Sequence, residues 1–369
     1  MKCTCSKKDL NDALNAVVKA VAVKPSTPVL AGIYLRAADD TLELQATNFS
    51  ISIIAKIPAN VEVEGAIVVA GGYFTNIVGK LGGEIVTLTN EDDAATVTLR
   101  SEAASFDLLS MDAEDFPRIN KEDATHSFRI PKDALKNLIA RTVFACSKDE
   151  SRPVFTGCLI DIAGTAITFA ATNTSRIAIA RDQLFDELES LQFIVHAATL
   201  RNVLGMLYKS SDNVVSVDFY GTGVAFTFDN IFMSSRIIDG TFPPYDKVIP
   251  ASCATTAEVD VAELRVAIER MQIIAQETEY KTVLFKFTQD GLEISANSYN
   301  VGKSIEHVDA NVNGDDLEIS FNFSYLLDAL KVFDTKTIGF GMNQPLMPAK
   351  IQGTDDESFI YIITPLRTQ

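Results

Sequence analysis

Residues 31–48 read AGIYLRAADDTLELQATN, and the same eighteen-residue pattern returns twice along the chain. It recurs as TGCLIDIAGTAITFAATN at 156–173 and as KTVLFKFTQDGLEISANS at 281–298, so each copy starts 125 residues after the previous one. In each copy, apolar and polar residues alternate on both sides of a turn of small or acidic residues, which predicts a β-hairpin. A repeated unit this long is a domain, so the sequence predicts three copies of one domain.

Six windows with apolar residues at helical spacing flank the hairpins, one before and one after each copy. These windows are residues 7–20, 73–81, 131–145, 199–209, 261–275 and 322–333. Ser6 is a suitable N-cap for the first window, and Pro131 suits the start of the third. Short alternating strands follow each second helix. One unit is therefore an α+β domain in which two helices pack on antiparallel sheets.

The ends of the first two units share a Phe-Pro step, at Phe116-Pro117 and at Phe242-Pro243. A proline forces the residue before it out of a helix, so each step marks the start of an extended linker. We therefore predict domains at residues 1–120, 126–250 and 254–369.

The composition excludes several classes of protein. No run of eighteen apolar residues is present, and the N-terminal segment lacks an apolar signal region, so we expect neither a membrane span nor secretion. Five cysteines are an odd number and too few for a disulfide framework, which favours the cytoplasm. Cys3 and Cys5 are expected to be packed side chains on one face of a strand rather than a metal site.

The sequence contains few residues that could form a catalytic or metal-binding site. The three histidines lie far apart, and residues 72–80 fail as a phosphate-binding loop because Leu81 stands where Ser or Thr is needed. Four acidic pairs fall where hairpin turns are expected, so they are interpreted as solvated turn residues. The pairs begin at Asp39, Asp92, Asp315 and Asp355. We therefore predict no enzyme activity, no cofactor and no metal.

Charge is distributed unevenly. The chain has a net charge of −17, yet the six helical windows hold twelve basic residues against six acidic ones. A cationic helical layer on an acidic protein fits an electrostatic division between a nucleic-acid face and an outer face. The alternative is that lysine is simply favoured on helix surfaces, and composition alone does not decide between the two.

Several segments together resemble the bacterial sliding clamps, the family of the β subunit of the DNA polymerase III holoenzyme. They are ATNTSRIAIA from Ala171, SRPVFTG from Ser151, DGTFPPYDKVIP from Asp239, FNFSYLLDAL from Phe321 and the terminal TPLR. The similarity covers essentially the whole chain in register. It implies three tandem clamp domains that form half of a six-domain ring, and a processivity factor that slides on double-stranded DNA without sequence specificity.

The resemblance also implies partners and contact residues. The partners are a second copy of the chain, DNA polymerase III subunits, the clamp loader and other proteins that carry a clamp-binding motif. The implied DNA contacts are Lys24, Lys80, Arg141, Lys148, Arg152, Arg201 and Lys209. The implied dimer interface joins Phe106 and Leu108 to Ile273 and Ile274 of the other copy, although the helical pattern alone favours a core role for the two isoleucines.

A cleft for short peptides with a glutamine and apolar anchors is implied between the second and third domains. Its residues are Phe155, Thr172, Thr174, Ser175, Arg176, Ile177, Pro243, Lys247, Val248, Asn322, Tyr325, Leu346, Pro348, Ile362, Ile363, Thr364, Pro365 and Leu366. This chain has Thr174-Ser175 where the family usually has Gly-His, and Lys247 and Thr364 also depart from the family pattern. The preferred peptide is therefore left open.

Two other functions are weighed against the clamp. A three-domain scaffold or adhesion protein would use the cationic helices only to cover its sheets. An enzyme would need the acidic pairs to converge on a metal ion, which separate hairpin tips are poorly placed to do.

Overall fold

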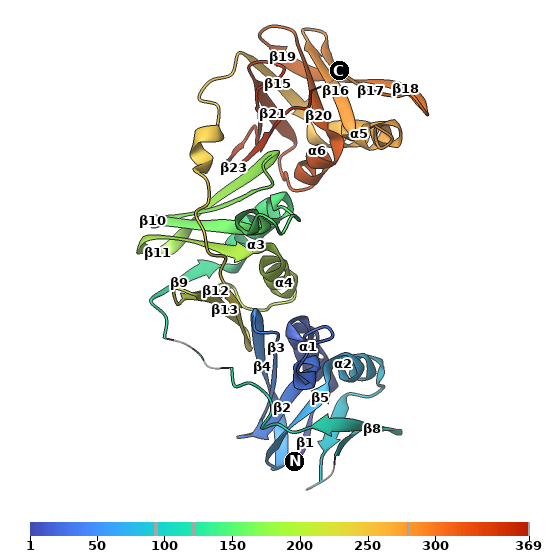
Figure 1. The fold of residues 1–369 in the computed structure, drawn as a ribbon, viewed down its shortest axis with the longest axis vertical. Coiled ribbons are helices and arrows are strands. Elements are labelled where there is room, and N and C mark those ends of the chain that lie inside the picture. Colours follow the sequence, from blue (N-terminus) through green and yellow to red (C-terminus); the bar gives the residue numbers. More distant parts are fainter. Residues whose placement is uncertain (92–94, 120, 122, 279, 368–369) are drawn as a thin grey trace. The chain divides into compact units, whose positions relative to one another are not determined.

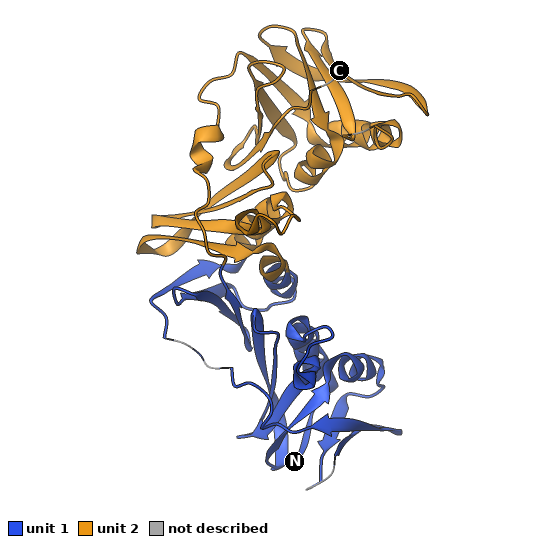
Figure 2. Cartoon of the chain, in the orientation of Figure 1, with its two compact units in different colours: residues 1–132, 202–237 blue, residues 133–201, 238–369 orange. Residues whose placement is uncertain are grey.

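The structure is a computed structural model, and it describes residues 1–91, 95–119, 121, 123–278 and 280–367. The chain divides into two compact units (Figure 2). Unit 1 comprises residues 1–132 and 202–237, and unit 2 comprises residues 133–201 and 238–369. The second predicted domain is therefore shared between the two units, and each unit is described by itself.

The first and third repeats form the predicted hairpins. In the first, β2 (Gly32–Ala38) pairs with β3 (Thr41–Thr47), and the turn residues Asp39 and Asp40 both have positive φ angles, 50° and 54°. In the third, β16 (Thr282–Thr288) pairs with β17 (Gly291–Ser298). Short polar side chains tolerate the left-handed conformation that a tight turn imposes, which explains the acidic residues at the first turn.

The second repeat also turns back at the predicted position, Gly164. Its two halves belong to one element, β10 (Gly157–Thr172). Residues 157–162 pair with residues 191–196 of β11 (Arg176–His196), and residues 166–172 pair with residues 177–183. The register of this ladder shifts on both sides of Gly164, whose φ is 64°. Gly164 stands where the other copies turn, and residues from both sides of this turn meet. Leu159 and Ala170 share one core cluster, and the Tyr245 hydroxyl lies against both Asp161 and Thr168.

Unit 1 contains one antiparallel sheet of twelve strands, in the order β1-β6-β7-β8-β5-β2-β3-β4-β14-β13-β12-β9. Strand β4 pairs with β14, for example at Ala55 and Ile231, so this sheet continues from the first predicted domain into the second. Its remaining strands are β1 (Lys2–Ser6), β4 (Ile51–Val63), β5 (Gly65–Ala70), β6 (Ile85–Thr89), β7 (Thr96–Ser101), β8 (Ala104–Met111), β9 (His126–Pro131), β12 (Val214–Phe219), β13 (Gly223–Phe228) and β14 (Ile231–Arg236).

The helices of the first repeat pack on this sheet. They are α1 (Lys7–Val17), extended by η1 (Val18–Ala20), and α2 (Gly71–Lys80), with η2 (Pro28–Ala31) between them. Ser6 caps α1 as predicted, because its hydroxyl accepts the Asp9 backbone N–H. Leu10 and Leu14 of α1 and Phe74 of α2 are fully buried, and α1 lies against β3, β4 and α2 (Figure 1).

Unit 2 contains two antiparallel sheets. One has the order β10-β11-β23-β22-β21-β15-β19, and the other has the order β18-β17-β16-β20. The pairing of β11 with β23, for example Ile177 with Ile362, joins the second and third predicted domains. The other strands are β15 (Thr255–Asp260), β18 (Gly302–Val308), β19 (Ala310–Asn313), β20 (Leu317–Asn322), β21 (Thr337–Met342), β22 (Ala349–Gly353) and β23 (Asp356–Ile363).

The remaining predicted helices are also present. They are α3 (Lys132–Thr142), α4 (Ala197–Leu207), α5 (Val261–Ala275) and α6 (Phe323–Leu330), with the 3₁₀ turns η3 (Val143–Ala145), η4 (Pro153–Thr156) and η5 (Tyr245–Val248). Asp260 and Asn322 cap α5 and α6 through their side chains. Leu264, Ile268 and Met271 of α5 are buried as the periodicity predicts. No described helix combines the length and apolar composition that crossing a membrane requires.

Candidate functional site

An apolar cavity of about 210 Å³ lies in unit 2 where β11, the linker before β15 and the end of β23 meet. Ten of its twelve lining residues were predicted for the peptide cleft. They are Phe155, Thr172, Thr174, Arg176, Ile177, Pro243, Val248, Pro348, Ile362 and Thr364. Below them lies a cluster of buried residues that includes Leu159, Ile179 and Phe242. Segments that are far apart in the sequence thus form one small apolar site.

The other eight predicted cleft residues do not line this cavity. They are Ser175, Lys247, Asn322, Tyr325, Leu346, Ile363, Pro365 and Leu366. Ile363 is fully buried because adjacent residues of a strand point to opposite faces, and its neighbour Ile362 lines the cavity. Leu346 is 58% exposed and Val248 is 45% exposed, so apolar surface does continue outside the cavity.

Two lining residues, Pro244 and Tyr245, were missed by the sequence analysis. The Tyr245 hydroxyl donates to the Asp161 carboxylate at 2.7 Å, which ties the linker turn η5 to β10. Burial and the neighbouring Asp161 carboxylate raise the pKa of Tyr245, so this hydrogen bond is present at any physiological pH. A signal was available, because Tyr245 belongs to the same quoted segment as Pro243 and Val248.

The turn between β10 and β11 is built from the Ala-Thr-Asn motif. Asn173 accepts the backbone N–H groups of Ser175 and Arg176, and the Thr172 hydroxyl donates to the Arg176 carbonyl at 2.7 Å. The Thr172 hydroxyl also accepts the N–H of Thr174, whose φ is 75°. These side-chain bonds satisfy the turn backbone and hold Thr174 in the left-handed region.

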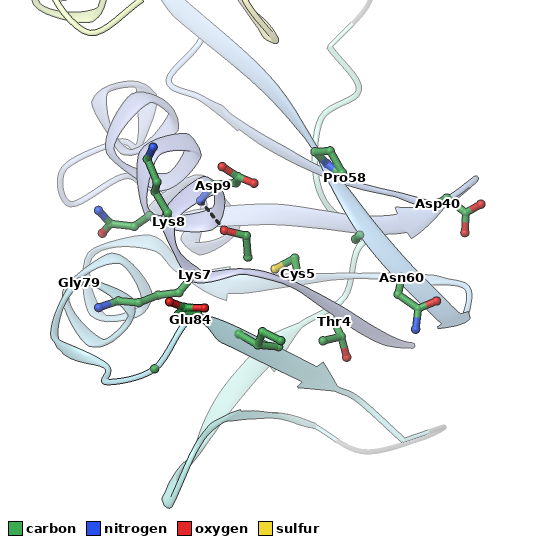
Figure 3. Close-up of a pocket in the computed structure, with 15 residues that line it drawn as sticks. Thr4, Cys5, Lys7, Lys8, Asp9, Asp40, Pro58, Asn60, Gly79 and Glu84 are labelled. Carbon is green, nitrogen blue, oxygen red and sulfur yellow. Dashed lines mark hydrogen bonds between the residues drawn. The ribbon is translucent and has the colours of Figure 1, made fainter.

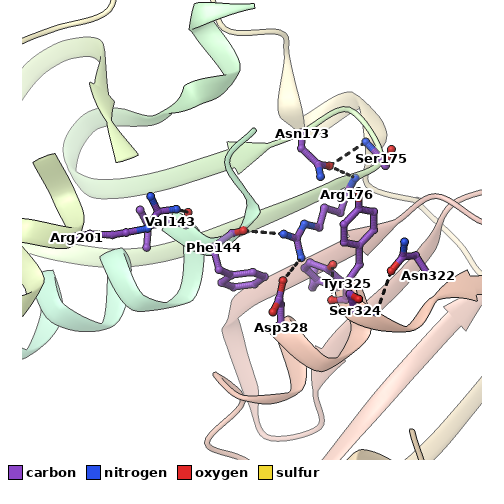
Figure 4. Close-up of polar contacts among 11 residues, drawn as sticks. Val143, Phe144, Asn173, Ser175, Arg176, Arg201, Asn322, Ser324, Tyr325 and Asp328 are labelled. Atoms are coloured by element: carbon purple, nitrogen blue, oxygen red, sulfur yellow. Dashed lines mark hydrogen bonds and ion pairs between the residues drawn. The ribbon is translucent and has the colours of Figure 1, made fainter. Parts of the chain in front are cut away.

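Arg176 fastens the cavity to helix α6 and turn η3 (Figure 4). Its side chain is only 7% exposed, and it donates to Asp328 at 2.9 Å and to the Phe144 carbonyl at 2.7 Å. The guanidinium also lies 4.3 Å from the Tyr325 ring centroid. Arg201 of α4 donates to the Val143 carbonyl of the same turn, η3, at 3.1 Å. A buried charge is thus paired and hydrogen-bonded, as its desolvation requires.

Arg141, a predicted DNA contact, is occupied by other bonds. Its side chain is 13% exposed, and it bonds Asp356 at 2.9 Å, Asp334 at 3.1 Å and the Ser358 hydroxyl at 3.0 Å. Burial opposes ionisation of Asp356, but hydrogen bonds from Ser358 and the charge of Arg141 outweigh it and hold the Asp356 pKa below its usual value. These contacts assign Arg141 to an ion-pair cluster inside unit 2.

The other predicted DNA contacts have exposed side chains. They are Lys24, Lys80 and Lys209 of unit 1 and Lys148, Arg152 and Arg201 of unit 2. Lys209 shares an open groove of about 700 Å³ with Lys8 and Lys19 of α1 and η1. The two α1-side lysines belong to the cationic helical windows but were not among the predicted contacts. Within unit 1, the fold therefore brings three cationic side chains to one groove, which Asp9, Asp12 and Asp229 also line.

A larger hollow of about 1160 Å³ opens at the N-terminal end of α1 (Figure 3). Its lining carries both signs of charge, including Lys7, Asp9, Asp40 and Glu84. Lys7 is used by the fold, because its ammonium group donates to the Leu81 carbonyl at the end of α2. Asp9 donates its backbone N–H to the cap residue Ser6. These contacts stabilise the first repeat and present no ligand chemistry of their own.

Two strand edges expose apolar side chains. Residues 104–109 of β8 pair only with β7, and β18 is one of the two edge strands of its sheet. Phe106 is 41% exposed, Leu109 of the same strand is 77% exposed, and Ile273 of α5 is 64% exposed. Leu108 and Ile274 are half-buried. The core role weighed for Ile273 is therefore wrong, and Leu109 is an exposed edge residue that the alternation argument missed.

Three matches cover nearly the whole chain. Residues 1–120, 129–244 and 246–367 match the N-terminal, central and C-terminal domains of the DNA polymerase III beta subunit. The beta sliding clamp of Bacillus subtilis is 32% identical over 379 residues, with 100% of each chain covered. The chain belongs to the β sliding clamps of DNA polymerase III. A clamp of this family is a processivity factor and is not itself an enzyme.

Other relatives agree with this assignment. The beta sliding clamp of Staphylococcus epidermidis is 29% identical with 100% of each chain covered. The crystal structure of the B. subtilis clamp matches with a TM-score of 0.94 and 31% identity, and that of the Thermotoga maritima beta subunit with 0.94 and 25%. Both cover 100% of each chain. The three-domain α+β fold and the clamp function predicted from the sequence are confirmed.

The two competing functions do not survive this assignment. A structural scaffold does not account for the full-length match to the clamps. Asp39, Asp40, Asp315 and Asp355 lie in turns or bends, and the pair at Asp92 lies outside the described residues. The interpretation as a solvated turn residue is wrong for Asp356, which begins β23 and pairs with Arg141. Among the residues that the structure describes, no group of three or more metal-binding side chains is placed to hold an ion.

Proposed function

We propose that two copies of this clamp close head to tail into a ring around double-stranded DNA. The support is a pair of apolar strand edges. One is β8 in the first repeat, and the other is β18 in the third repeat. Exposed edge strands invite pairing, and a heterologous contact between the β8 edge of one copy and the β18 edge of the other would bury Phe106, Leu109 and Ile273. Two such contacts would complete a closed dimer and cover both of these exposed edges.

The DNA would be held by exposed cationic side chains. Lys24, Lys80, Lys148, Arg152, Arg201 and Lys209 would contact phosphates, which carry no sequence information, so the ring would slide. Lys8 and Lys19 join this set because they share the groove of Lys209. Arg141 leaves the set, because its charge is already neutralised by Asp334 and Asp356. Tight binding is unnecessary, since a closed ring is retained by topology.

Partner proteins would insert a short peptide into the 210 Å³ cavity of unit 2. Apolar side chains fill such a cavity, while the surrounding exposed apolar residues Leu346 and Val248 extend the contact. The expected partners are DNA polymerase III subunits, the clamp loader and other proteins with a clamp-binding motif, acting in the cytoplasm. A small apolar site shared by several partners favours exchange over permanent binding.

The ring is tested by mass in solution. Light scattering should give twice the 40.2 kDa chain mass for the wild type. Phe106→Arg places a charge in the proposed seal and should give the single-chain mass, together with loss of retention on circular DNA. Phe185→Arg is the matched control, because Phe185 is 53% exposed but lies on β11, which forms neither of the two edges. A Phe106→Arg protein that stays dimeric would refute this interface.

A further inference from the structure

We infer that Asp107 of one copy pairs with Lys303 of the other copy and so fixes the register in which two chains join. This inference rests on the proposed ring and names the residues that align its edges. Asp107 is the only charged residue of β8, and its exposed carboxylate accepts the Thr98 hydroxyl of β7 at 2.6 Å. No basic side chain bonds to this carboxylate within the part of the chain that the structure describes.

Strand β18 carries one cation that the fold does not use. Its other two charged or titratable side chains have partners, because Glu306 accepts Arg270 of α5 at 2.8 Å and His307 lies 3.9 Å from Glu293. Lys303 is exposed and has no hydrogen-bond or ion-pair partner among the described residues. The two edges proposed for the ring therefore each present one charge that lacks an opposite charge, and these two charges differ in sign.

The hairpin ladders show which residues of the three repeats occupy the same place. Thr47, Thr172 and Asn297 follow one another at intervals of 125 residues. Their cross-strand partners are Ser52 on β4, Ile177 on β11 and Lys303 on β18. These three partners are therefore equivalent positions, although their side chains differ in chemistry.

Strand β8 is in turn equivalent to β14. The two strands start at Ala104 and Ile231, and each pairs with the preceding strand across a turn of two residues. The first residue of each turn has a positive φ, 49° at Glu102 and 47° in the second turn. Asp107 and Ser234 both lie three residues after the start of their strands, so they are equivalent positions.

Two ladders within the chain show how these edges meet. In unit 1, Ser234 of β14 lies opposite Ser52 of β4. In unit 2, Ile362 of β23 lies opposite Ile177 of β11. Each junction thus matches side chains of one kind at this place, hydroxyl with hydroxyl in unit 1 and apolar with apolar in unit 2.

The same register between two copies places Asp107 opposite Lys303. It also places Leu109, which is 77% exposed, opposite Val301, which is 54% exposed and lies just before β18. Directly opposed side chains of an antiparallel pair lie on one face, and opposite charges there stabilise the pair. One register therefore matches an acid with a base and an exposed apolar side chain with another.

The opposite face of the two strands agrees with this register. Phe106 would lie opposite Ser304, whose hydroxyl donates to the Met271 sulfur of α5 at 3.2 Å. Phe106 would thus pack on the side covered by α5, the helix that exposes Ile273. A slip of one residue would turn Phe106 away from α5, and a slip of two would set Asp107 against an apolar side chain.

The size of the effect follows from the two junctions of the ring. Replacing opposite charges by like charges weakens a cross-strand pair by about tenfold in its equilibrium constant. Both junctions change together, so one charge reversal should raise the dimer Kd about a hundredfold. A lysine on an edge strand can instead serve only to prevent aggregation. In that case, reversing the charge of Lys303 would leave the dimer Kd unchanged.

The test measures the dimer Kd of the full-length protein by analytical ultracentrifugation of a dilution series at low ionic strength, where screening is weak. Asp107→Lys and Lys303→Asp alone should each raise the Kd about a hundredfold, because both junctions then carry like charges. The two substitutions combined in one chain reverse the pair and should return the Kd to within about threefold of the wild type. This recovery also shows that the substituted chain folds.

Glu102→Lys combined with Lys303→Asp is the matched control. It gives the same net charge as the reversed pair, but residue 102 lies in the turn before β8, outside the proposed pair. Its Kd should stay about a hundredfold above that of the wild type. Recovery by this control, no recovery by the reversed pair, or an unchanged Kd in both single variants would overturn the inference. A wild type that stays monomeric throughout the dilution series would instead refute the proposed ring.

Discussion

Removing Asp328 should destabilise unit 2 by leaving the Arg176 charge poorly compensated. The guanidinium is 7% exposed, and Asp328 supplies its one carboxylate at 2.9 Å. Breaking a fully buried ion pair costs about 3–5 kcal/mol. Asp328 is itself 39% exposed, so water replaces part of the lost interaction, and the Phe144 carbonyl and Tyr325 ring remain in contact. We therefore expect Asp328→Ala to cost about 2 kcal/mol, near the value of one charge-assisted hydrogen bond.

The assay is thermal unfolding at neutral pH. A loss of about 2 kcal/mol lowers Tm by roughly 4–8 °C for a unit of this size. Asp328→Asn keeps an acceptor without the charge and should lose about half as much. Asp246→Ala is the matched control, because its pair with Arg181 is longer, 3.6 Å, and both side chains are exposed. If Asp328→Ala and Asp246→Ala shift Tm equally, the buried pair does not stabilise the site as argued.

Two further predictions follow from perturbed ionisation. The Asp356 pKa is lowered in the folded protein, so the stability it provides is present above about pH 4 and is lost as the pH falls through the lowered value. Acid titration of Tm should therefore be shallower for Asp356→Asn, and an identical acid limb would contradict this role. Burial raises the pKa of Cys3 to about 11 and those of Cys5 and Cys146 to about 12, and it raises that of fully buried Cys158 as well. Iodoacetamide at pH 8 should modify the half-buried Cys253 first in the folded protein, and mass spectrometry showing faster labelling of Cys3 would refute this order.

Much of the fold could be read from local patterns. A period of two placed the hairpin strands around Asp39 and Asp40, and a period of 3.6 placed the helices that bury Leu10 and Leu264. Ten cavity residues were also predicted, because the resemblance to the clamp family could be carried over position by position along the sequence. These features depend on residues that are near in sequence or held by a repeated unit, so a single sequence contains the information.

Other features depend on distant segments. The sequence marks Arg141 as a helical cation, but only packing brings Asp334 and Asp356 against it. The pattern placed Ile273 in the core, whereas the fold leaves it exposed beside an edge strand. The repeat predicted the hairpin at 156–173, but only the fold pairs both of its halves with β11. Local periodicity states which face of an element is apolar and does not state what covers that face.

The sequence by itself determined that this chain is three copies of an α+β domain with cationic helices and a clamp function. The tertiary structure alone decided which charges are neutralised, which strand edges remain open, and which residues line the cavity. The physical reason is range: propensity and periodicity act over a few residues, whereas ion pairs, strand pairing and burial are settled by segments more than a hundred residues apart, such as Arg176 and Asp328.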